Sequence, residues 1–535
     1  MTRDPDAGQY GCAPVFAATM FSTGQLASIL IPALLLACAA AWGVAWRYRA
    51  AMRRLMSAPT PAGVTHAARA PVGETPPPAP FSLADNRRAA WRLTLLLIGL
   101  SCLIAVSSAS LWMRLSFPGE PFRPKQAAVV ALTQLWPVVP ALGLMWRWSA
   151  WQLMGALVLF CVPCFAVMLW RSIEPRPMEV LLFLAIEIGP ALLVVVPLFL
   201  GNATRAVAPW LLPPIIGLMW ASMLSMGVLA VLIERRSPLL AQLPLWLGTT
   251  GVFASFALLP WLLAGWPLRW LGRALGRAYA KQWLSELMVV FTVVWGVVLA
   301  MQALTVASSA GWRGVALLAP LAWIPLAMTL NARLRPPPAN PPTLLVLRVF
   351  QRDAQVQALF DHVIERWRLT GNTVLIAGTD LADRTLDGAD IFAFLDGELA
   401  GRFIRSAAEV APRLAGFDLG PDADGRYRVN ECYCHDTTWQ DALHALVGRS
   451  DVVLMDLRGF QAHNAGCRYE LAALAGTSRA LRVVVLADAQ TDRAAAAQAM
   501  AAAAPERFVW LDANHTDVRK RHEVLAALFS AARAP

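Results

Sequence analysis

Long apolar runs separated by short polar segments fill the first 335 residues of the chain. Each run holds 17 to 25 residues with few charges, which is about the length that a helix needs to cross the hydrocarbon core of a bilayer. The pattern predicts nine transmembrane helices, over residues 24–46, 91–113, 129–146, 151–170, 180–200, 209–233, 243–265, 284–307 and 315–331. Three of these runs are short, so eight or ten helices remain as alternatives.

Positive charge predicts how these helices are oriented. Residues 1–342 contain 25 Lys and Arg against 10 Asp and Glu, whereas residues 343–535 contain 21 against 25. With the N-terminus outside, sixteen basic residues fall in inner segments and nine in outer segments, as the positive-inside rule requires. The sequence therefore predicts a multi-pass protein of the inner (cytoplasmic) membrane whose C-terminal domain is cytoplasmic. The basic half is interpreted as contacting the lipid bilayer, and no nucleic acid is expected as a partner.

Three segments with little apolar character divide the chain. Residues 57–86 are rich in Pro and Ala, which predicts a flexible cytoplasmic loop within a transmembrane domain over 1–335. Residues 265–281 place a basic residue every four positions beside Leu and Trp, typical either of an amphipathic helix on the inner leaflet or of a basic loop. Residues 336–342 (PPPANPP) predict a stiff spacer before a cytoplasmic domain over 343–535.

After residue 342 the apolar runs become short and alternate with amphipathic stretches. Strands are predicted over 343–350, 373–378, 427–433, 451–457, 482–487 and 507–511. Helices are predicted over 353–368, 389–405, 438–448, 464–476, 493–503 and 516–532. This alternation is typical of a parallel, Rossmann-like sheet with helices on both faces. The expected fold is an α-helical transmembrane bundle followed by an α/β domain.

Polar residues follow most of the predicted strands. The carboxyl ends of parallel strands meet at one edge of a sheet, where open α/β folds bind ligands. Gly378 would allow close backbone approach, and Arg458 could hold a phosphate bidentately. The alternative is that these are ordinary loop residues. The residues predicted to gather there are Gln351, Arg352, Gly378, Thr379, Asp380, His435, Asp436, Asp456, Arg458, Gly459 and Asp488.

Glu470 is the sharpest single candidate for a catalytic group. It follows Cys467 by three residues in the predicted helix 464–476, at the border of the apolar stripe. Partial burial raises the pKa of a carboxyl group that has no partner. Such an acid can act as a nucleophile or stabilise a sugar cation. The alternative is a half-exposed glutamate that pairs with an arginine.

Two further features have competing interpretations. Glu187 is the only acid deep within a predicted transmembrane helix, where acids either serve transport or pair across helices. Cys432 and Cys434 share one face of a predicted strand, but no second ligand pair with zinc spacing exists, so no metal site is predicted. No structural disulfide is expected in a cytoplasmic domain.

The segment 450–471, SDVVLMDLRGFQAHNAGCRYEL, resembles the core of TIR and TIR-like domains. In those domains a Ser-Asp pair and an apolar strand precede a short loop, and a Cys lies two or three residues before a Glu-Leu pair. The segment is also similar to nucleoside 2-deoxyribosyltransferase-like domains, where a strand ending in Asp precedes an Asn-containing loop and a Tyr-Glu-Leu. Both families share a flavodoxin-like sheet, which the resemblance implies for residues 343–535.

In both families that glutamate serves the cleavage of an N-glycosidic bond, of NAD in TIR enzymes and of nucleosides in the transferases. The resemblance thus implies Glu470 as the catalytic carboxylate. It implies Asp451, Asp456 and Asn464 as structural or ligand-orienting residues. It covers the rest of the domain only in the order of its elements, and the segment 416–436 matches neither family.

Together these features predict a membrane-anchored TIR-like protein that binds a nucleotide such as NAD and cleaves its N-glycosidic bond in signalling or defence. One alternative is a non-enzymatic signalling or scaffold protein whose TIR-like domain self-associates. A second alternative is a transporter with a regulatory domain, in which Glu187 serves the transport path. No resident cofactor is expected, because NAD or another nucleotide would be the substrate.

Overall fold

A computed structural model describes residues 23–56, 76–171, 176–185, 188, 202–348, 362–377, 388–435, 437–477, 480, 482–500, 505–514 and 518–530. The chain divides into two compact units. The membrane unit comprises residues 1–46 and 97–327, and the α/β unit comprises residues 47–96 and 328–535. The units do not follow chain order, because the α/β unit takes residues 47–96 from the part that the sequence assigns to the transmembrane domain.

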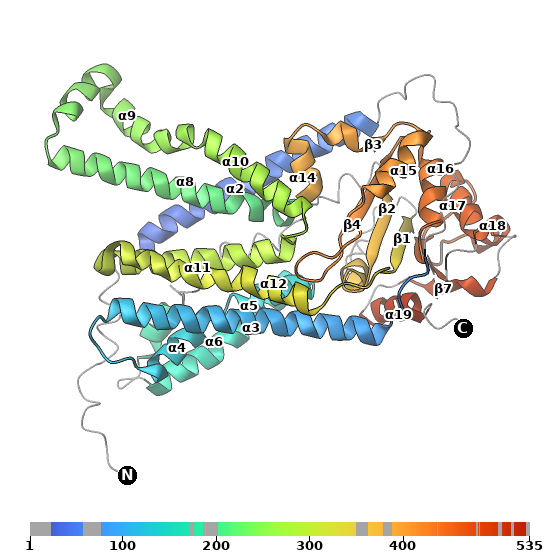
Figure 1. Cartoon of the computed structure of the whole chain (residues 1–535), viewed down its shortest axis with the longest axis horizontal. Coiled ribbons are helices and arrows are strands. Elements are labelled where there is room, and N and C mark those ends of the chain that lie inside the picture. The colour runs from blue at the N-terminus through green and yellow to red at the C-terminus, as the bar shows by residue number, and fades with distance from the viewer. Residues whose placement is uncertain are drawn as a thin grey trace, which may run out of the picture. The chain divides into compact units, whose positions relative to one another are not determined.

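Helices make up the described part of the membrane unit (Figure 1). Six stretches within the described residues are long and apolar enough to cross a membrane, which is the character of a membrane protein. The expected count of nine is not confirmed. The helices, three of which continue into the α/β unit, are α2 (Thr23–Met56), α3 (Leu83–Ser116), α4 (Pro124–Gln134), α5 (Val138–Met145), α6 (Ala150–Arg171), α8 (Asn202–Glu234), α9 (Pro238–Leu263), α10 (Gly265–Ala280), α11 (Glu286–Ala310), the 3₁₀ helix η2 (Gly311–Ala322) and α12 (Trp323–Leu334).

Proline explains one departure from the predicted helices. The run 129–146 forms two helices, α4 and α5, that are separated at Trp136 and Pro137. Proline has no N–H to donate and disfavours the helical conformation of the residue before it. The run 315–331 is divided between η2 and α12, while most of the run 180–200 lies outside the described residues.

The basic segment 265–281 forms a helix, α10, so the loop alternative is wrong. Trp266 and Trp270 are exposed on it, and Arg269, Arg273 and Arg277 recur at four-residue spacing. An exposed helix with aromatic and basic side chains suits a membrane surface. Its placement on the inner leaflet stays a prediction.

The α/β unit contains a seven-stranded, wholly parallel sheet in the order β3-β4-β2-β1-β5-β6-β7 (Figure 1). Without the two-residue β3, the order matches the 3-2-1-4-5-6 order of Rossmann folds. The flavodoxin-like order 2-1-3-4-5 that the resemblance implies is therefore not confirmed. The strands are β1 (Thr343–Arg348), β2 (Asn372–Ala377), β3 (Phe403–Ile404), β4 (Val429–Cys434), β5 (Val452–Asp456), β6 (Arg482–Ala487) and β7 (Phe508–Asp512).

Helices cover both faces of this sheet, because its strands are apolar on both sides. One face packs against residues 362–367 and α19 (Val518–Phe529). The opposite face packs against α15 (Ala407–Ala415), α16 (Trp439–Val447), α17 (Ala465–Ala475) and α18 (Arg493–Ala499). The helix after β1 and the helix after β5 thus lie on opposite faces. The neighbouring strands β1 and β5 therefore form the topological switch point of the sheet, where such folds bind ligands.

The ends of α2 and α3 complete the first of these two cores. Tyr48 and Met52 from α2 and Phe81, just before α3, are buried in the same apolar cluster as residues of β1, β2, β5 and β6. The ring of Phe81 contacts Trp367 and Phe529 edge-on at 5.7 and 6.0 Å between centroids. Phe81 lies within the predicted flexible loop 57–86, and Tyr48 and Met52 precede that loop. Residues 57–75 of the loop lie outside the described residues.

One predicted helix, 389–405, is wrong in its second half. Helix α14 (Gly388–Leu395) is followed by a turn in which Gly397 adopts φ +77° and the amide of Glu398 donates to the carbonyl of Ala393 at 2.8 Å. Glycine favours such a helix end because it lacks a Cβ atom. A 3₁₀ turn, η3 (Leu399–Arg402), the short β3 and then α15 follow. The amide of Arg405 donates to the Glu409 carboxylate at 2.9 Å, which helps to start α15.

Candidate functional site

The carboxyl end of β5 carries an ion pair between two predicted ligand-binding residues. Arg458 donates from Nε and Nη2 to the two carboxylate oxygens of Asp456, at 2.9 and 2.8 Å, and its backbone amide also donates to Asp456. Both residues are buried. The edge of the Arg458 guanidinium that was expected to hold a phosphate with two hydrogen bonds is therefore occupied by Asp456. A ligand phosphate would have to displace Asp456 or bind the remaining edge of the guanidinium.

The loop after β5 is fixed by the loop after β6. Asp488 accepts hydrogen bonds from the amide of Gly459 at 3.0 Å and from the hydroxyl of Thr491 at 2.8 Å. Thr491 also donates to the carbonyl of Leu457 at 3.0 Å. Gly459 has φ +70°, a conformation that suits glycine. Asp488 thus serves loop structure, as the alternative of ordinary loop residues proposed.

Asn464 and Asp451 have structural contacts at opposite ends of this segment. Asn464 precedes α17, and its Oδ1 accepts from the backbone amide of Gln461 at 2.7 Å. Asp451 precedes β5, and its Oδ2 accepts from the backbone amide of Thr343 at 2.9 Å, which ties the starts of β5 and β1 together. Asp451 therefore lies at the amino edge of the sheet, away from the switch point.

Glu470 lies on α17, the helix that follows the switch-point strand β5. It is buried, with 8% of its surface exposed, and no hydrogen-bond partner is present for its Oε2 among the described residues. Burial raises the pKa of Glu470 from 4.5 to about 8, because the ionised form loses its hydration. The alternative of a half-exposed glutamate paired with an arginine is therefore wrong. Glu470 is a carboxyl group that is mostly neutral at pH 7.

The thiol of Cys467 connects this glutamate to the strand end. Burial and, to a smaller extent, the carboxylates of Glu470 and Asp456 raise the pKa of Cys467 to about 12. Both acids are thus within electrostatic reach of the same sulfur, one from the helix and one from the end of β5. The structure therefore brings Glu470, Asp456 and Arg458 into one region. The thiol of Cys467 stays protonated near neutral pH, so it does not serve as a nucleophile.

His435 lies elsewhere on the sheet. It follows β4, its ring packs against Phe403 at 5.5 Å, and it is buried with no partner for its Nδ1 among the described residues. Strands β2 and β1 separate β4 from β5. Three strand spacings of about 4.8 Å place the two strand ends about 14 Å apart. His435 and Glu470 would therefore act together only on a ligand as long as a dinucleotide.

Several predicted residues lie outside the described residues. They are Glu187, Gln351, Arg352, Gly378, Thr379, Asp380 and Asp436. The residues that follow β1 and β2 therefore add no described side chain to the site.

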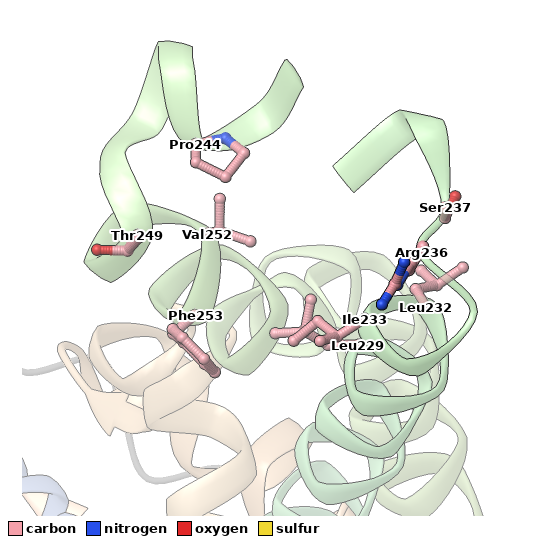
Figure 2. A pocket seen from close by; sticks show the side chains of 9 residues that line it. All are labelled: Leu229, Leu232, Ile233, Arg236, Ser237, Pro244, Thr249, Val252 and Phe253. Carbon is pink, nitrogen blue, oxygen red and sulfur yellow. The ribbon is translucent and has the colours of Figure 1, made fainter. Parts of the chain in front are cut away.

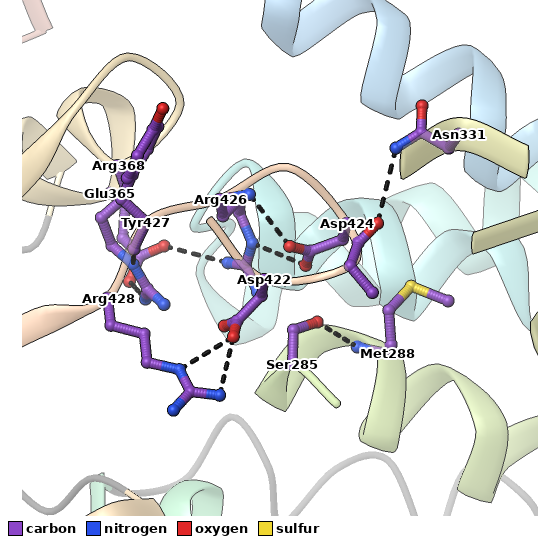
Figure 3. A network of polar contacts seen from close by, with 11 residues as sticks. Ser285, Met288, Asn331, Glu365, Arg368, Asp422, Asp424, Arg426, Tyr427 and Arg428 are labelled. Atoms are coloured by element: carbon purple, nitrogen blue, oxygen red, sulfur yellow. Dashed lines mark hydrogen bonds and ion pairs between the residues drawn. The ribbon is translucent and has the colours of Figure 1, made fainter. Parts of the chain in front are cut away.

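The segment 416–436, which matched neither resembling family, contains a second buried polar region (Figure 3). Pro421 and Tyr427 pair across a turn, and Gly425 within it adopts φ +85°. We call the buried ion pairs at this turn the arginine–carboxylate network. It comprises Glu365, Arg368, Asp418, Asp422, Asp424, Arg426 and Arg428.

The network pairs almost every charge it buries. Arg426 binds Asp424 at 3.0 Å through Nε and Glu365 at 3.3 Å through Nη1. Arg428 binds Asp422 at 2.7 Å through Nη2 and Asp418 at 2.8 Å through Nη1. The Nη2 atom of Arg426 is buried with no hydrogen-bond partner among the described residues. The geometry indicates a structural role for the network, because its charged groups form ion pairs with one another.

Asp422 is the titratable member of this network. Burial and the neighbouring Asp424 raise its pKa from 3.8 to about 7, although the Arg428 guanidinium opposes both. Sequence reasoning missed the network, because the pairing of Arg426 with Glu365 joins residues 61 positions apart. The alternation of acids and arginines in DLGPDADGRYRVN was the available signal.

The described residues hold no group of three or more His, Cys, Asp or Glu side chains arranged to bind a metal ion. Cys432 and Cys434 have their sulfur atoms 3.7 Å apart, and the seven cysteines in the described part of the chain are free. No protein-family profile matches the chain, and comparisons with curated proteins and with solved structures give no match either.

Proposed function

We propose that the α/β unit binds a nucleotide such as NAD at the carboxyl edge of β1 and β5, and that Glu470 promotes cleavage of its N-glycosidic bond. The observation that carries the proposal is the buried carboxyl group of Glu470, which has an unpartnered oxygen on the helix after the switch-point strand. Its place in the segment that resembles TIR-like domains supports the same role.

In the proposed reaction, the bond between ribose C1′ and the nicotinamide nitrogen breaks, and the electron pair leaves with nicotinamide. Water adds to C1′, and one proton is released to solvent. The ionised Glu470 would stabilise the positive charge that develops on the sugar. Bound NAD carries a cationic nicotinamide, and an adjacent positive charge lowers the pKa of a carboxyl group. The substrate would therefore help to ionise the residue that acts on it.

This mechanism predicts a defined pH dependence. The pKa of Glu470 is raised to about 8 in the protein without ligand, so its ionised fraction rises tenfold per pH unit below that value. We expect kcat/KM, which reports on the free protein, to increase from pH 6 to pH 8. A flat or falling profile over this range would exclude the carboxylate role.

The decisive experiment uses the full-length protein in detergent or nanodiscs, incubated with NAD, with released nicotinamide measured by chromatography. We expect release by the wild type and a loss of at least about 100-fold for Glu470→Gln. Glu506→Gln is the matched control, since it makes the same change at an exposed position. Absence of nicotinamide release, or equal rates for wild type and Glu470→Gln, refutes the enzymatic proposal.

A non-enzymatic signalling or scaffold function is the second candidate. Two observations favour it. Arg458, the residue expected to bind a phosphate, is already paired with Asp456, and α2 and α3 contribute to the core of the α/β unit. This candidate predicts that the full-length protein self-associates in detergent without releasing nicotinamide. Light scattering would show the same oligomer for wild type and Glu470→Gln, whereas a monomer in both would contradict it.

A further inference from the structure

The pair of helices α8 and α9 within the membrane unit lines a half-open cavity of about 350 Å³. The cavity lies near the turn between the two helices, and Figure 2 shows side chains from both reaching toward it. A volume near the lower end of the range for ligand pockets, about 300 to 1,000 Å³, suits one acyl-chain segment better than a whole lipid. The lining residues are Leu229, Leu232, Ile233, Arg236, Ser237, Pro244, Thr249, Val252 and Phe253.

A break in α9 creates this space. Gly248 adopts φ +68° and ψ 167°, so the helix is interrupted between Pro244 and Thr249. Glycine adopts this conformation without the steric cost that a Cβ atom brings. Away from the turn, the two helices are joined through Ser222, which donates to the carbonyl of Ala257 at 2.8 Å and accepts from Trp261 at 3.0 Å. The helices are thus joined there and line the half-open cavity near the turn.

The surroundings of the cavity are those of a lipid-facing surface. In the stretch Gln242–Ala280, which covers most of α9 and all of α10, only 6% of the most apolar 18 residues are buried within the protein. Trp246 on α9 is 85% exposed, and Ile233 and Phe253 at the cavity are about half exposed. In a bilayer such side chains contact acyl chains. An apolar cavity open to that environment excludes water and accommodates a hydrocarbon chain.

One charged group lines the cavity. Arg236 lies in the turn after α8 and adopts φ +48°, an uncommon conformation for a residue with a side chain. Its backbone amide donates to the carbonyl of Ile233 at 3.0 Å. Its guanidinium has no hydrogen-bond or ion-pair partner among the described residues. Ser237 and Thr249 add hydroxyl groups to the lining. A guanidinium with free donors beside an apolar cavity complements an anionic group attached to a hydrocarbon chain.

We propose that the cavity between α8 and α9 binds an anionic membrane phospholipid, with an acyl chain between Leu229, Ile233 and Val252 and the phosphate on Arg236. Helix α8 has 33 residues, and α9 lies within a stretch long and apolar enough to cross a membrane. The turn between them would then lie where lipid headgroups lie, so the guanidinium is at the right depth for a phosphate. Binding at this site is independent of any chemistry at Glu470.

The test is native mass spectrometry of the full-length protein in detergent, with dioleoyl phosphatidylglycerol or dioleoyl phosphatidylcholine added at equal concentration. We expect one retained phosphatidylglycerol and at least a tenfold preference over phosphatidylcholine. Arg236→Gln should abolish the preference, whereas Arg235→Gln, its neighbour outside the cavity lining, should preserve it. Equal effects of the two substitutions would overturn the role of Arg236.

A second variant tests the cavity itself. Ile233→Trp enlarges a side chain that is half exposed, so the change should fill the cavity without disturbing buried packing. We expect it to reduce retention of phosphatidylglycerol at least fivefold while thermal unfolding stays unchanged. Undiminished retention would place the lipid elsewhere. Retention of added oleate in preference to phosphatidylglycerol would identify a fatty-acid site and overturn the phospholipid proposal.

Discussion

Two regions of the α/β unit bury carboxyl groups in opposite ways. In the arginine–carboxylate network, Asp424 is fully buried at its side chain and pairs with Arg426. On α17, Glu470 is almost as buried but has an oxygen with no partner. A buried carboxyl group without a counterion becomes neutral, whereas one with an arginine can keep its charge. The first arrangement stabilises a loop, and the second leaves a carboxyl group whose pKa is raised to about 8 by burial.

The largest effect should follow when one partner is removed from the network. Arg426→Leu leaves the buried Asp424 without its arginine and deprives Glu365 of one of its two. We expect a loss of about 3 to 5 kcal/mol in the free energy of unfolding, because a buried charge would lose its counterion. Thermal unfolding of the full-length protein measures it. Arg468→Leu, at an exposed position, is the control, and an equal shift in both variants would contradict the comparison.

Replacing Glu470 should have the opposite effect, an increase in the free energy of unfolding. Its pKa is raised on folding, so between pH 4.5 and about 8 the folded state binds more protons than the unfolded state. Stability therefore falls as the pH rises through this range. Glu470→Gln should stabilise the protein by about 2 to 4 kcal/mol at pH 8 and leave it nearly unchanged at pH 5.

The matched control for that variant is Glu506→Gln, which changes an exposed glutamate and should show no such pH dependence. Thermal unfolding at the two pH values measures both variants. If Glu470→Gln destabilised the protein at pH 8, the carboxylate would have to be paired, and the contrast with the network would disappear.

A neutral polar contact should show the smallest effect. Asn86 on α3 is buried and donates to the carbonyl of Arg366 at 2.6 Å and to the hydroxyl of Thr370 at 2.8 Å. Asn86→Ala removes both bonds, and we expect a loss of about 1 to 2 kcal/mol. Arg88→Ala breaks only the exposed pair with Asp85 and should cost less than about 0.5 kcal/mol. Equal thermal shifts would mean that α3 adds no stability to this core.

Most strands of the sheet were predictable from the sequence. Strands β1, β2, β4, β5, β6 and β7 lie within two residues of the predicted ranges. The central strands β1, β5 and β6 were the clearest, because a strand buried on both faces is a nearly continuous apolar run. The two-residue β3 and the helix α15 were missed, since so short a strand leaves no periodicity. The contribution of α2 and α3 was also missed, because Tyr48 and Phe81 acquire their partners only through tertiary contacts.

The site was predictable where it depended on local spacing. Glu470 lies three residues after Cys467 on one helix, so both side chains lie on the same face and both are buried. The expected rise in the pKa of Glu470 is found. The pairing of Arg458 with Asp456 was not foreseen, because it depends on the path of the loop after β5. The pairing of Arg426 with Glu365 was not predictable either, because it depends on how the fold brings together two segments that are 61 residues apart in the chain.

The position of Phe81 has a consequence for biosynthesis. Its aromatic neighbour Phe529 lies roughly 450 residues later in the chain, and nearly all of the membrane unit is translated between them. At a ribosomal rate of about 5 to 20 residues per second, that interval lasts about 20 to 90 s. The apolar side chains around Phe81 therefore emerge long before their partners exist, and a nascent chain of this protein would need chaperone protection there until its last helix is made.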